Sequence, residues 1–279
     1  MDSALYVVAT PIGNLRDMTL RALDVLREAD LIAAEDTRNT ANLLKQYQIG
    51  GKRLLALHQH NERGGAEKII EHLQRGETVA LVTDAGTPAV SDPGALLVEA
   101  VRAAGCRVVP VPGANAAVAA LSAAGLAAPH FLFYGFLPNK SAARRTELQA
   151  LAASPYTLVF YEAPHRILEC AADLQAVLGG EREIVFAREL TKLFESIHRC
   201  RLDEALDWLN GDANRQRGEF VLLVSGAPPQ SGEEEGLRVL KHLLDELPLK
   251  QAVQLAVKIS GAQRNTLYQA ALRMKEEAE

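Results

Sequence analysis

The stretch that decides the fold runs from Val79 to Gly94 and reads VALVTDAGTPAVSDPG. Its first four residues form an apolar run with the length of a buried strand, and a helical pattern resumes only after Gly94. The intervening twelve residues contain two Gly, two Pro and two Asp, whereas connections in α/β units usually have about two to six residues. A long, turn-rich loop after a buried strand predicts a ligand site beyond the carboxyl end of a parallel sheet.

Short apolar runs of the same kind recur on both sides of this stretch and alternate with amphipathic, helix-like segments. In the first part of the chain they lie at 5–9, 31–34, 54–57 and 108–111. This alternation predicts an α/β domain with a mostly parallel sheet over residues 1–114. After an alanine-rich helix, further runs follow one another more closely, at 131–136, 157–161, 183–187, 194–198 and 220–224. They predict a second α/β domain with a mixed sheet over residues 115–226.

The last part of the chain changes in composition. Residues 227–236, APPQSGEEEG, are polar and rich in Pro and Gly, which predicts a linker. Apolar periodicity then predicts short helices at 237–244, 249–259 and 265–273, and Ser260-Gly261-Ala262 gives the last two the spacing of a helix-turn-helix. The segment 237–279 carries seven Lys/Arg and five Asp/Glu, a charge of +2 within a chain of formal charge −5.

Two further loops concentrate turn residues or charges directly after predicted strands. Thr10-Pro11-Ile12-Gly13 is either a binding loop or a tight strand-to-helix turn. Glu35, Asp36 and Arg38 place two carboxylates and a guanidinium at a strand end, where an ordinary helix cap is the plainer interpretation.

The long loop offers the clearest ligand chemistry. Backbone amides freed by Gly86 and the carboxylate of Asp84 suit a ligand with hydroxyl or ammonium groups. Asp92-Pro93-Gly94 is typical of a helix start. The chain contains neither G-x-G-x-x-G nor G-x-x-x-x-G-K-[ST], so a bound nucleotide-like ligand need not carry a phosphate.

Basic residues cluster after the strands of the second domain. Lys140 precedes Arg144 and Arg145, a later loop carries Arg166, and a third cluster ends at Lys192. One such cluster is usually a solvated surface. Three of them at strand ends would give a polyanion local contacts despite the negative net charge.

The sequence gives little support to metal, disulfide or membrane classes. His58 and His60 lie two apart on one strand face without an evident third ligand, and the three cysteines are widely spaced, so neither a metal site nor a disulfide framework is expected. No segment has the roughly 20 strongly apolar residues of a membrane span, and the N-terminus lacks the pattern of a signal peptide. We therefore expect a cytoplasmic, globular protein.

Taken together, these motifs resemble a known family. They comprise TPIGNL at 10–15, AEDTR at 34–38, DAGTP at 84–88 with SDPG at 91–94, Pro112-Gly113, FYE at 160–162 with His165-Arg166, and ELTK at 189–192. In this order they are similar to the bacterial 16S ribosomal RNA (cytidine-2′-O)-methyltransferase I group of the tetrapyrrole methylase superfamily. The likeness runs from about residue 5 to 226, and 237–279 resembles the helix-turn-helix appendage of that group.

The resemblance implies two α/β domains of the class III S-adenosylmethionine methyltransferase type, with S-adenosylmethionine in the cleft between them. It also implies a homodimer that methylates a decoding-centre cytidine of 16S rRNA within the small ribosomal subunit, without a role for DNA or a membrane. Carried over by position, the cofactor contacts are Pro11, Ile12, the loop at 84–90 with Asp84, Gly86, Thr87 and Val90 in particular, Asn115, Ala116, Tyr161, Glu162 and Ala163, with Phe220 and Val221 as weaker additions.

Methyl transfer to a ribose hydroxyl needs close positioning and a group that makes the hydroxyl a better nucleophile. A carboxylate, an imidazole or a lysine can do this. The first candidates are Glu35, Asp36 and Lys192, and Glu189 and His60 are second choices. Contacts to the RNA backbone are expected from Arg38, Lys140, Arg144, Arg145 and Arg166.

Two other functions compete with this one. A porphyrinoid methyltransferase would use the same cleft, but the basic clusters and the appendage favour RNA. A DNA-binding regulator would read DNA with residues 249–273, whose charge is modest for that task. The appendage itself either holds a distant RNA helix, through Lys250, Lys258 and Arg264, or serves as a dimerisation or packing element.

Overall fold

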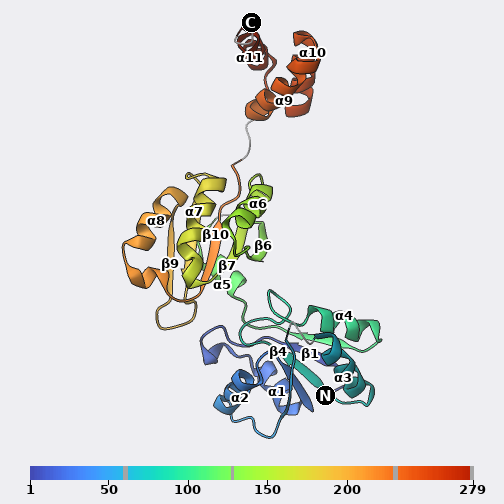
Figure 1. The fold of residues 1–279 in the computed structure, drawn as a ribbon. Coiled ribbons are helices and arrows are strands. Elements are labelled where there is room, and N and C mark those ends of the chain that lie inside the picture. The colour runs from blue at the N-terminus through green and yellow to red at the C-terminus, as the bar shows by residue number, and fades with distance from the viewer. Residues whose placement is uncertain (59–61, 127–128, 229–231, 277–279) are drawn as a thin grey trace. The chain divides into compact units, whose positions relative to one another are not determined.

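The computed structural model describes residues 1–58, 62–126, 129–228 and 232–276 (Figure 1). The chain divides into two compact units. The first consists of Met1–Ala152 with Tyr156–Ser225, and the second of Ala153–Pro155 with Gly226–Glu279. The first unit contains two five-stranded sheets and the second is helical.

The first sheet is entirely parallel, with the order β3-β2-β4-β1-β5. Its strands are β1 (Leu5–Val8), β2 (Leu31–Ala34), β3 (Arg53–Ala56), β4 (Val79–Val82) and β5 (Val108–Val111). Its helices are α1 (Leu20–Glu28), α2 (Thr37–Gln46), α3 (Glu62–Gln74) and α4 (Ala95–Ala103). The short 3-10 helix η1 (Leu15–Asp17) precedes α1.

Both faces of this sheet are buried, because alternate side chains point to opposite sides of a strand. Ala80 and Val82 of β4 pack in the core that contains Val25 and Leu44 of α1 and α2. Leu81, between them, packs in the core that contains Leu97 of α4. Two apolar faces explain why the strands read as continuous apolar runs.

The second sheet is mixed, with the order β6-β7-β10-β8-β9 and one parallel pair, β6 with β7, among these strands. Its strands are β6 (Phe131–Phe136), β7 (Thr157–Glu162), β8 (Glu183–Arg188), β9 (Ser196–Arg201) and β10 (Phe220–Val224). Its helices are α5 (Ala116–Ala123), α6 (Ser141–Leu151), α7 (Ile167–Leu178) and α8 (Leu202–Asn210), with the 3-10 helices η2 (Pro164–Arg166) and η3 (Ala213–Gln216). Helix α5 packs on one face, and α6, α7 and α8 pack on the other.

The predicted α/β fold class with two sheets is therefore confirmed, and one strand prediction needs correction. The run 194–198 was expected to be a strand, but β9 begins at Ser196 and continues to Arg201. Leu193 and Phe194 instead belong to a turn, closed by the Glu195 N–H donating to the Lys192 carbonyl at 3.1 Å. These two residues are 89% and 67% exposed, so the apolar pattern there does not mark a buried strand.

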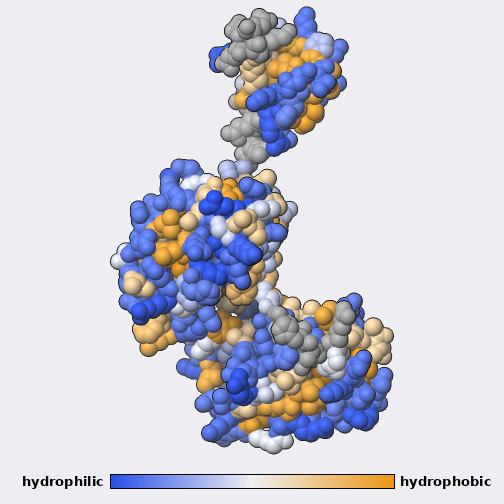
Figure 2. Space-filling view, in the orientation of Figure 1, coloured by the Kyte–Doolittle hydropathy of each residue, from blue (hydrophilic) through white to orange (hydrophobic). Residues whose placement is uncertain are grey.

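The C-terminal unit is a small three-helix domain with α9 (Gly232–Glu246), α10 (Leu249–Ser260) and α11 (Arg264–Glu276). The three helices share a core that includes Leu240, Val253 and Leu267. Figure 2 shows apolar side chains at the surface of this unit as well, and Leu255 and Ile259 of α10 are exposed.

The predicted linker 227–236 is wrong for residues 232–236, which form the first turn of α9. Gly236 is a packing position and not a flexible one, because a side-chain carbon there would lie 2.8 Å from Ser260 Oγ. Composition alone does not separate these two uses of glycine. Residues 229–231 lie outside the described part of the chain.

The structure also describes the cysteines, the possible membrane-spanning helices and the possible metal ligands. The three cysteines are free thiols, but Cys170 is buried whereas Cys106 and Cys200 are only partly buried. Among the described residues, no helix is long and apolar enough to cross a membrane, and no three His, Cys, Asp or Glu side chains are grouped as metal ligands. His60 lies outside the described residues.

Candidate active site

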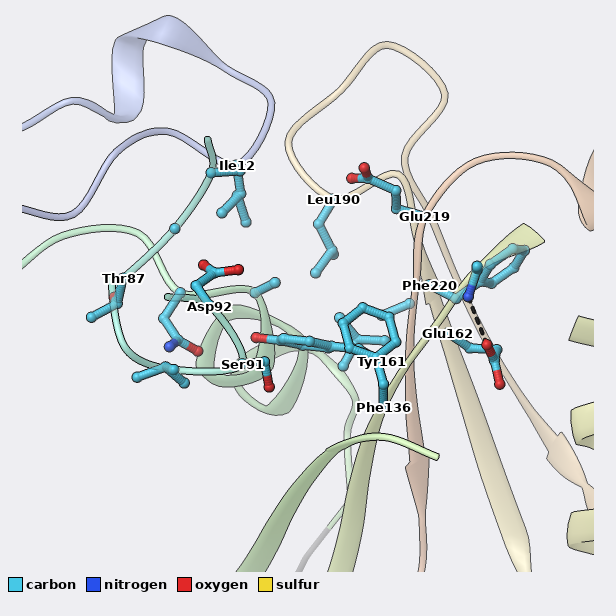
Figure 3. A pocket seen from close by; sticks show the side chains of 18 of the residues that line it. Ile12, Thr87, Ser91, Asp92, Phe136, Tyr161, Glu162, Leu190, Glu219 and Phe220 are labelled. Atoms are coloured by element: carbon cyan, nitrogen blue, oxygen red, sulfur yellow. Dashed lines mark hydrogen bonds between the residues drawn. The ribbon is translucent and has the colours of Figure 1, made fainter. Parts of the chain in front are cut away.

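A cavity of about 370 Å³ opens in the first unit and is lined by segments that follow or end strands of both sheets (Figure 3). The first sheet contributes the loops after β1, β4 and β5, and the second sheet contributes residues at or next to the ends of β6, β7, β8 and β10. The lining residues are Ile12, Ala85, Gly86, Thr87, Val90, Ser91, Asp92, Asn115, Ala116, Phe136, Tyr161, Glu162, Ala163, Pro164, Ala187, Leu190, Lys192, Glu219, Phe220 and Val221.

Most of the residues predicted to contact a cofactor lie in this lining, but Pro11 and Asp84 do not. Pro11 is buried. Asp84 is exposed, and its Oδ2 accepts a hydrogen bond from Asn39 Nδ2 at 2.8 Å. The lining residues that sequence analysis missed are Ser91, Asp92, Phe136, Pro164, Ala187, Leu190 and Glu219.

Gly86 serves the site differently from the prediction. Its amide is not free, because it donates to the Thr10 carbonyl at 3.0 Å while the Thr10 N–H donates to the Gly86 carbonyl at 2.9 Å. This isolated bridge ties the loop after β4 to the loop after β1. The φ of +83° at Gly86 lies in the left-handed region that favours glycine. The residue therefore shapes the cavity wall and does not offer a free donor to a ligand.

The loop from Ala89 to Gly94 is held in a strained conformation. Ala89 and Ser91 have φ of 67° and 62°, which residues with side chains rarely adopt. The Gly94 N–H donates to the buried carboxylate of Glu62, and the Ala89 N–H donates to the Pro93 carbonyl at 3.2 Å. These contacts fix the loop at the cavity.

Ser91 rests against the second sheet where β6 departs from regular pairing. The register between β6 and β7 shifts between Phe133 and Gly135. Gly135 has φ of +83°, and a side-chain carbon there would lie 2.6 Å from Ser91 Oγ. Only glycine accommodates both the backbone conformation and the close approach of Ser91.

The structure does not support the interpretation of Asp92 as part of a helix start. Helix α4 begins at Ala95 and its N-cap is Gly94, which makes no side-chain capping bond, so Asp92 does not start the helix. It lies in the cavity lining instead. Burial raises the pKa of Asp92 to about 6, and the negative charge of Glu35 acts in the same direction.

Aromatic side chains form one wall of the cavity. Phe136 lies edge-on to Tyr161, with 5.6 Å between ring centroids, and Phe133 packs against the same ring. The Tyr161 hydroxyl accepts a hydrogen bond from the Ala117 N–H at 3.3 Å. Asn115 is the N-cap of α5, where its Oδ1 accepts from the Val118 N–H at 3.1 Å. These bonds fix the wall relative to the start of α5.

The side chain of Glu162 is bonded within the turn after β7. Its Oε1 accepts from the Ala163 N–H at 2.8 Å and lies 3.1 Å from Nε of Arg166. Arg166 also donates through Nη2 to the carbonyl of Leu137 at 2.7 Å, and its side chain is only 12% exposed. Arg166 was expected to contact RNA, but these bonds make it a structural residue that joins the ends of β6 and β7.

A second strained turn, Glu189 to Lys192, brings three charges together. Glu189 and Thr191 have φ of 52° and 66°. Lys192 Nζ donates to Glu189 Oε1 and to Glu219 Oε2, both at 2.9 Å. Burial acts to lower the pKa of Lys192, but the hydrogen bonds to the two carboxylates outweigh it and raise that pKa. Lys192 therefore lies in the cavity lining as a charged ammonium group that two carboxylates hold in place.

The acidic candidates after β2 lie outside the lining. Asp36 is the N-cap of α2, where its Oδ1 accepts from the Arg38 N–H at 2.8 Å, which is the cap that the plainer interpretation predicts. The Arg38 side chain also pairs with it, and these hydrogen bonds hold the pKa of Asp36 at about 2. Glu35 accepts a hydrogen bond from the Asp84 N–H at 3.3 Å, and burial raises its pKa.

The predicted basic contacts separate into exposed and buried residues. Lys140 and Arg145 are exposed, and Arg38 is exposed at 87% of its side chain. Arg144 is completely buried, and its Nε donates to Asp173 Oδ2 at 2.7 Å. A buried arginine in an ion pair cannot contact RNA, so the prediction for Arg144 is corrected.

Comparison with known proteins agrees with this architecture. Residues 4–206 match the family of Tetrapyrrole (Corrin/Porphyrin) Methylases, and residues 230–275 match the RsmI C-terminal HTH domain. The chain is 56% identical over 273 residues to Ribosomal RNA small subunit methyltransferase I of Pseudomonas aeruginosa, with 96% of each chain covered. It is 52% identical to the protein of the same name from Escherichia coli O157:H7, over 97% of this chain and 95% of that one.

Solved structures share the fold of the first unit. The methyltransferase CobJ has a TM-score of 0.60 and 23% identity, covering 81% of this chain and 95% of its own. A uroporphyrin-III C-methyl transferase from Thermus thermophilus, complexed with S-adenyl homocysteine, has a TM-score of 0.55 and 20% identity, covering 80% and 97%.

Proposed function

This chain belongs to the tetrapyrrole methylases and, among them, to the ribosomal RNA small subunit methyltransferase I family, and from that premise we propose that it methylates a ribose 2′-hydroxyl of small-subunit ribosomal RNA. It is an S-adenosylmethionine-dependent methyltransferase. The proposed target is a decoding-centre cytidine of 16S rRNA, and the proposed working form is a cytoplasmic homodimer. Exposed Leu193 and Phe194 support an association surface.

The observation that carries the proposal is the cavity shared by the strand ends of the two sheets. Its volume of about 370 Å³ lies within the range of small-molecule sites. Apolar and aromatic side chains, including Tyr161 and Phe220, suit a flat adenine ring. The carboxylate of Glu219 suits the positive charge of the methionine portion. S-adenosylmethionine would supply a methyl group that its sulfonium already activates.

The charged turn at the cavity offers one chemical contribution. The Lys192 ammonium has three donors, and the two hydrogen bonds to Glu189 and Glu219 hold it in place. We propose that Lys192 lowers the pKa of the substrate hydroxyl by electrostatic stabilisation of developing negative charge. Glu189 is then a positioning residue, because it acts through Lys192.

The carboxylates after β2 are not part of this proposal. Asp36 is engaged by the guanidinium and the amide of Arg38, and its low pKa makes it a weak base. Glu35 is bonded to the Asp84 amide and lies outside the cavity lining.

RNA contacts are proposed for the basic side chains that reach solvent. Lys140, Arg145 and Arg38 are exposed on the first unit, and Lys250 and Lys258 are exposed on α10. They would bind phosphates and set the position of the RNA without reading its sequence.

The proposal is tested with S-adenosylmethionine that is tritiated in its methyl group. Small ribosomal subunits, protein-free 16S rRNA and a precorrin mixture are offered separately to the full chain. We expect label in RNA, in a dinucleotide that survives alkaline hydrolysis, because a 2′-O-methyl group blocks attack of that oxygen on the adjacent phosphate. Label in the precorrin fraction alone, or in a base, would contradict the proposal.

A further inference from the structure

We propose that Asp92 is the general base that accepts the proton of the ribose hydroxyl, an assignment that rests on the function proposed above. Neither its neighbouring residues in sequence nor its helix-start pattern indicates this role. The place of the carboxylate in the folded chain and the charges around it indicate this role instead.

The Asp92 carboxylate points into the cavity. In Figure 3 it lies below Ile12 and to the left of Leu190, on the opposite side of the view from Glu162. Ile12 follows β1 and Leu190 follows β8, so the carboxylate stands where segments of both sheets meet. A substrate hydroxyl that enters this cavity comes within reach of Asp92.

The position of Asp92 is enforced by its strained neighbours. Ser91, directly before it, has φ of 62° and lies against Gly135 of β6. Two residues after it, Gly94 is bonded to the buried Glu62 carboxylate. Strained backbone persists where the surrounding contacts over-determine it, and such contacts give a catalytic group a fixed direction.

The other acidic side chains of the cavity lining are already engaged. Glu219 is bonded to Lys192, and 78% of its side chain is exposed. Glu162 is bonded to the Ala163 amide and to Arg166. Asp92 forms no ion pair with a cation in the described part of the chain. Its carboxylate therefore remains available to accept a proton.

The surroundings of Asp92 make the carboxylate basic enough for this role. Burial is the largest of the effects that together raise its pKa to about 6. The negative charges of Glu35 and, to a smaller extent, Asp84 act in the same direction, and the Thr83 hydroxyl acts against them. Tyr161, from β7, faces it as a neutral hydroxyl whose own pKa burial raises. Lys192 and Glu219 form a mutually paired group elsewhere in the lining. A base whose pKa lies slightly below the working pH is largely ionised there and still accepts a proton effectively.

The proposed step balances. The hydroxyl oxygen forms a bond to the methyl carbon, the bond between that carbon and sulfur breaks with its electron pair left on sulfur, and the hydroxyl proton passes to an Asp92 oxygen. Asp92 then releases the proton to water. The carboxylate must be ionised at the start, so turnover should rise as pH increases through about 6 and then level off.

The test compares the full-length protein with its Asp92→Asn variant at saturating S-adenosylmethionine and saturating small subunits, from about pH 5 to about pH 8. We expect kcat at the upper end to fall by about 100-fold or more and the inflection to disappear, while the Kd for S-adenosylmethionine stays within about threefold. Asp24→Asn makes the same chemical change on the exposed surface of α1 and should leave the profile unchanged.

Folding and binding are checked separately. The raised pKa means that ionised Asp92 is disfavoured in the folded state, so at pH 8 the amide variant should melt no lower than the wild type.

A kcat within threefold of wild type, a retained inflection, or a loss explained entirely by weaker cofactor binding would overturn the assignment. If the wild type labels RNA in these assays, such results overturn the role of Asp92 alone. Absence of label with the wild type overturns the proposed function as well.

Discussion

Replacement of Arg144 by methionine tests whether this arginine belongs to the core or to an RNA surface. Arg144 is completely buried, and Nε donates to Asp173 Oδ2 at 2.7 Å. The Asp173 side chain is itself 3% exposed and also accepts from Ser141 and Arg145. Methionine keeps an unbranched apolar stem but removes the guanidinium and its charge.

The expected loss of stability is large, because the variant deprives a buried carboxylate of its buried partner. Breaking such a pair from one side usually costs about 3–5 kcal/mol. For a unit of this size, about 2–4 °C of melting temperature corresponds to each kcal/mol. We therefore expect the first unit to melt roughly 6–20 °C lower than in the wild type.

Differential scanning calorimetry at pH 7 measures this change, and Arg145→Met is the matched control. Arg145 contacts the same carboxylate at 2.5 Å, but its side chain is 52% exposed, so its removal should cost no more than about 1 kcal/mol. The reasoning is refuted if Arg144→Met melts within 2 °C of the wild type. It is also refuted if that variant keeps its stability and loses affinity for RNA.

Three other changes give separate tests. Lys192→Met should lower kcat at least about tenfold with little change in cofactor Kd; an unchanged kcat would exclude a chemical role. Gly135→Ala should destabilise the first unit by about 1–3 kcal/mol in urea, because of its positive φ and its contact with Ser91; equal stability would contradict this. Deletion of residues 226–279 should weaken RNA binding in filter assays and spare cofactor binding in calorimetry, whereas equal loss of both would indicate a structural role.

Local patterns in the sequence were sufficient to predict most of the fold. The run Val79–Val82 is apolar at every position because both faces of β4 are covered, and that property is visible without a structure. The loop after this strand was likewise recognisable from its length and its turn residues. The α9 start was missed because Gly232 and Gly236 serve close packing, which composition does not reveal.

The chemistry of individual side chains was harder to predict, because it depends on residues distant in the chain. Arg144 looked like a surface cation until Asp173, 29 positions later, was found beside it. Asp92 looked like a helix start because Pro93 and Gly94 follow it, and the contact between Ser91 and Gly135 that fixes its place is not encoded locally. Lys192 was found through its motif, but its partner Glu219 belongs to no recognisable pattern.

The central place of β10 in the second sheet has a consequence for the order in which the protein is made. The strand pairs with both β7 and β8, although it leaves the ribosome after them and after β9. The first sheet has all its strands by Val111, and nascent chains fold from the N-terminus as they emerge. The second sheet keeps a gap at its centre until Val224 has emerged. Phe220 and Val221 then close that gap and the cavity wall together, so a newly made chain gains its sheet and its ligand site in the same event.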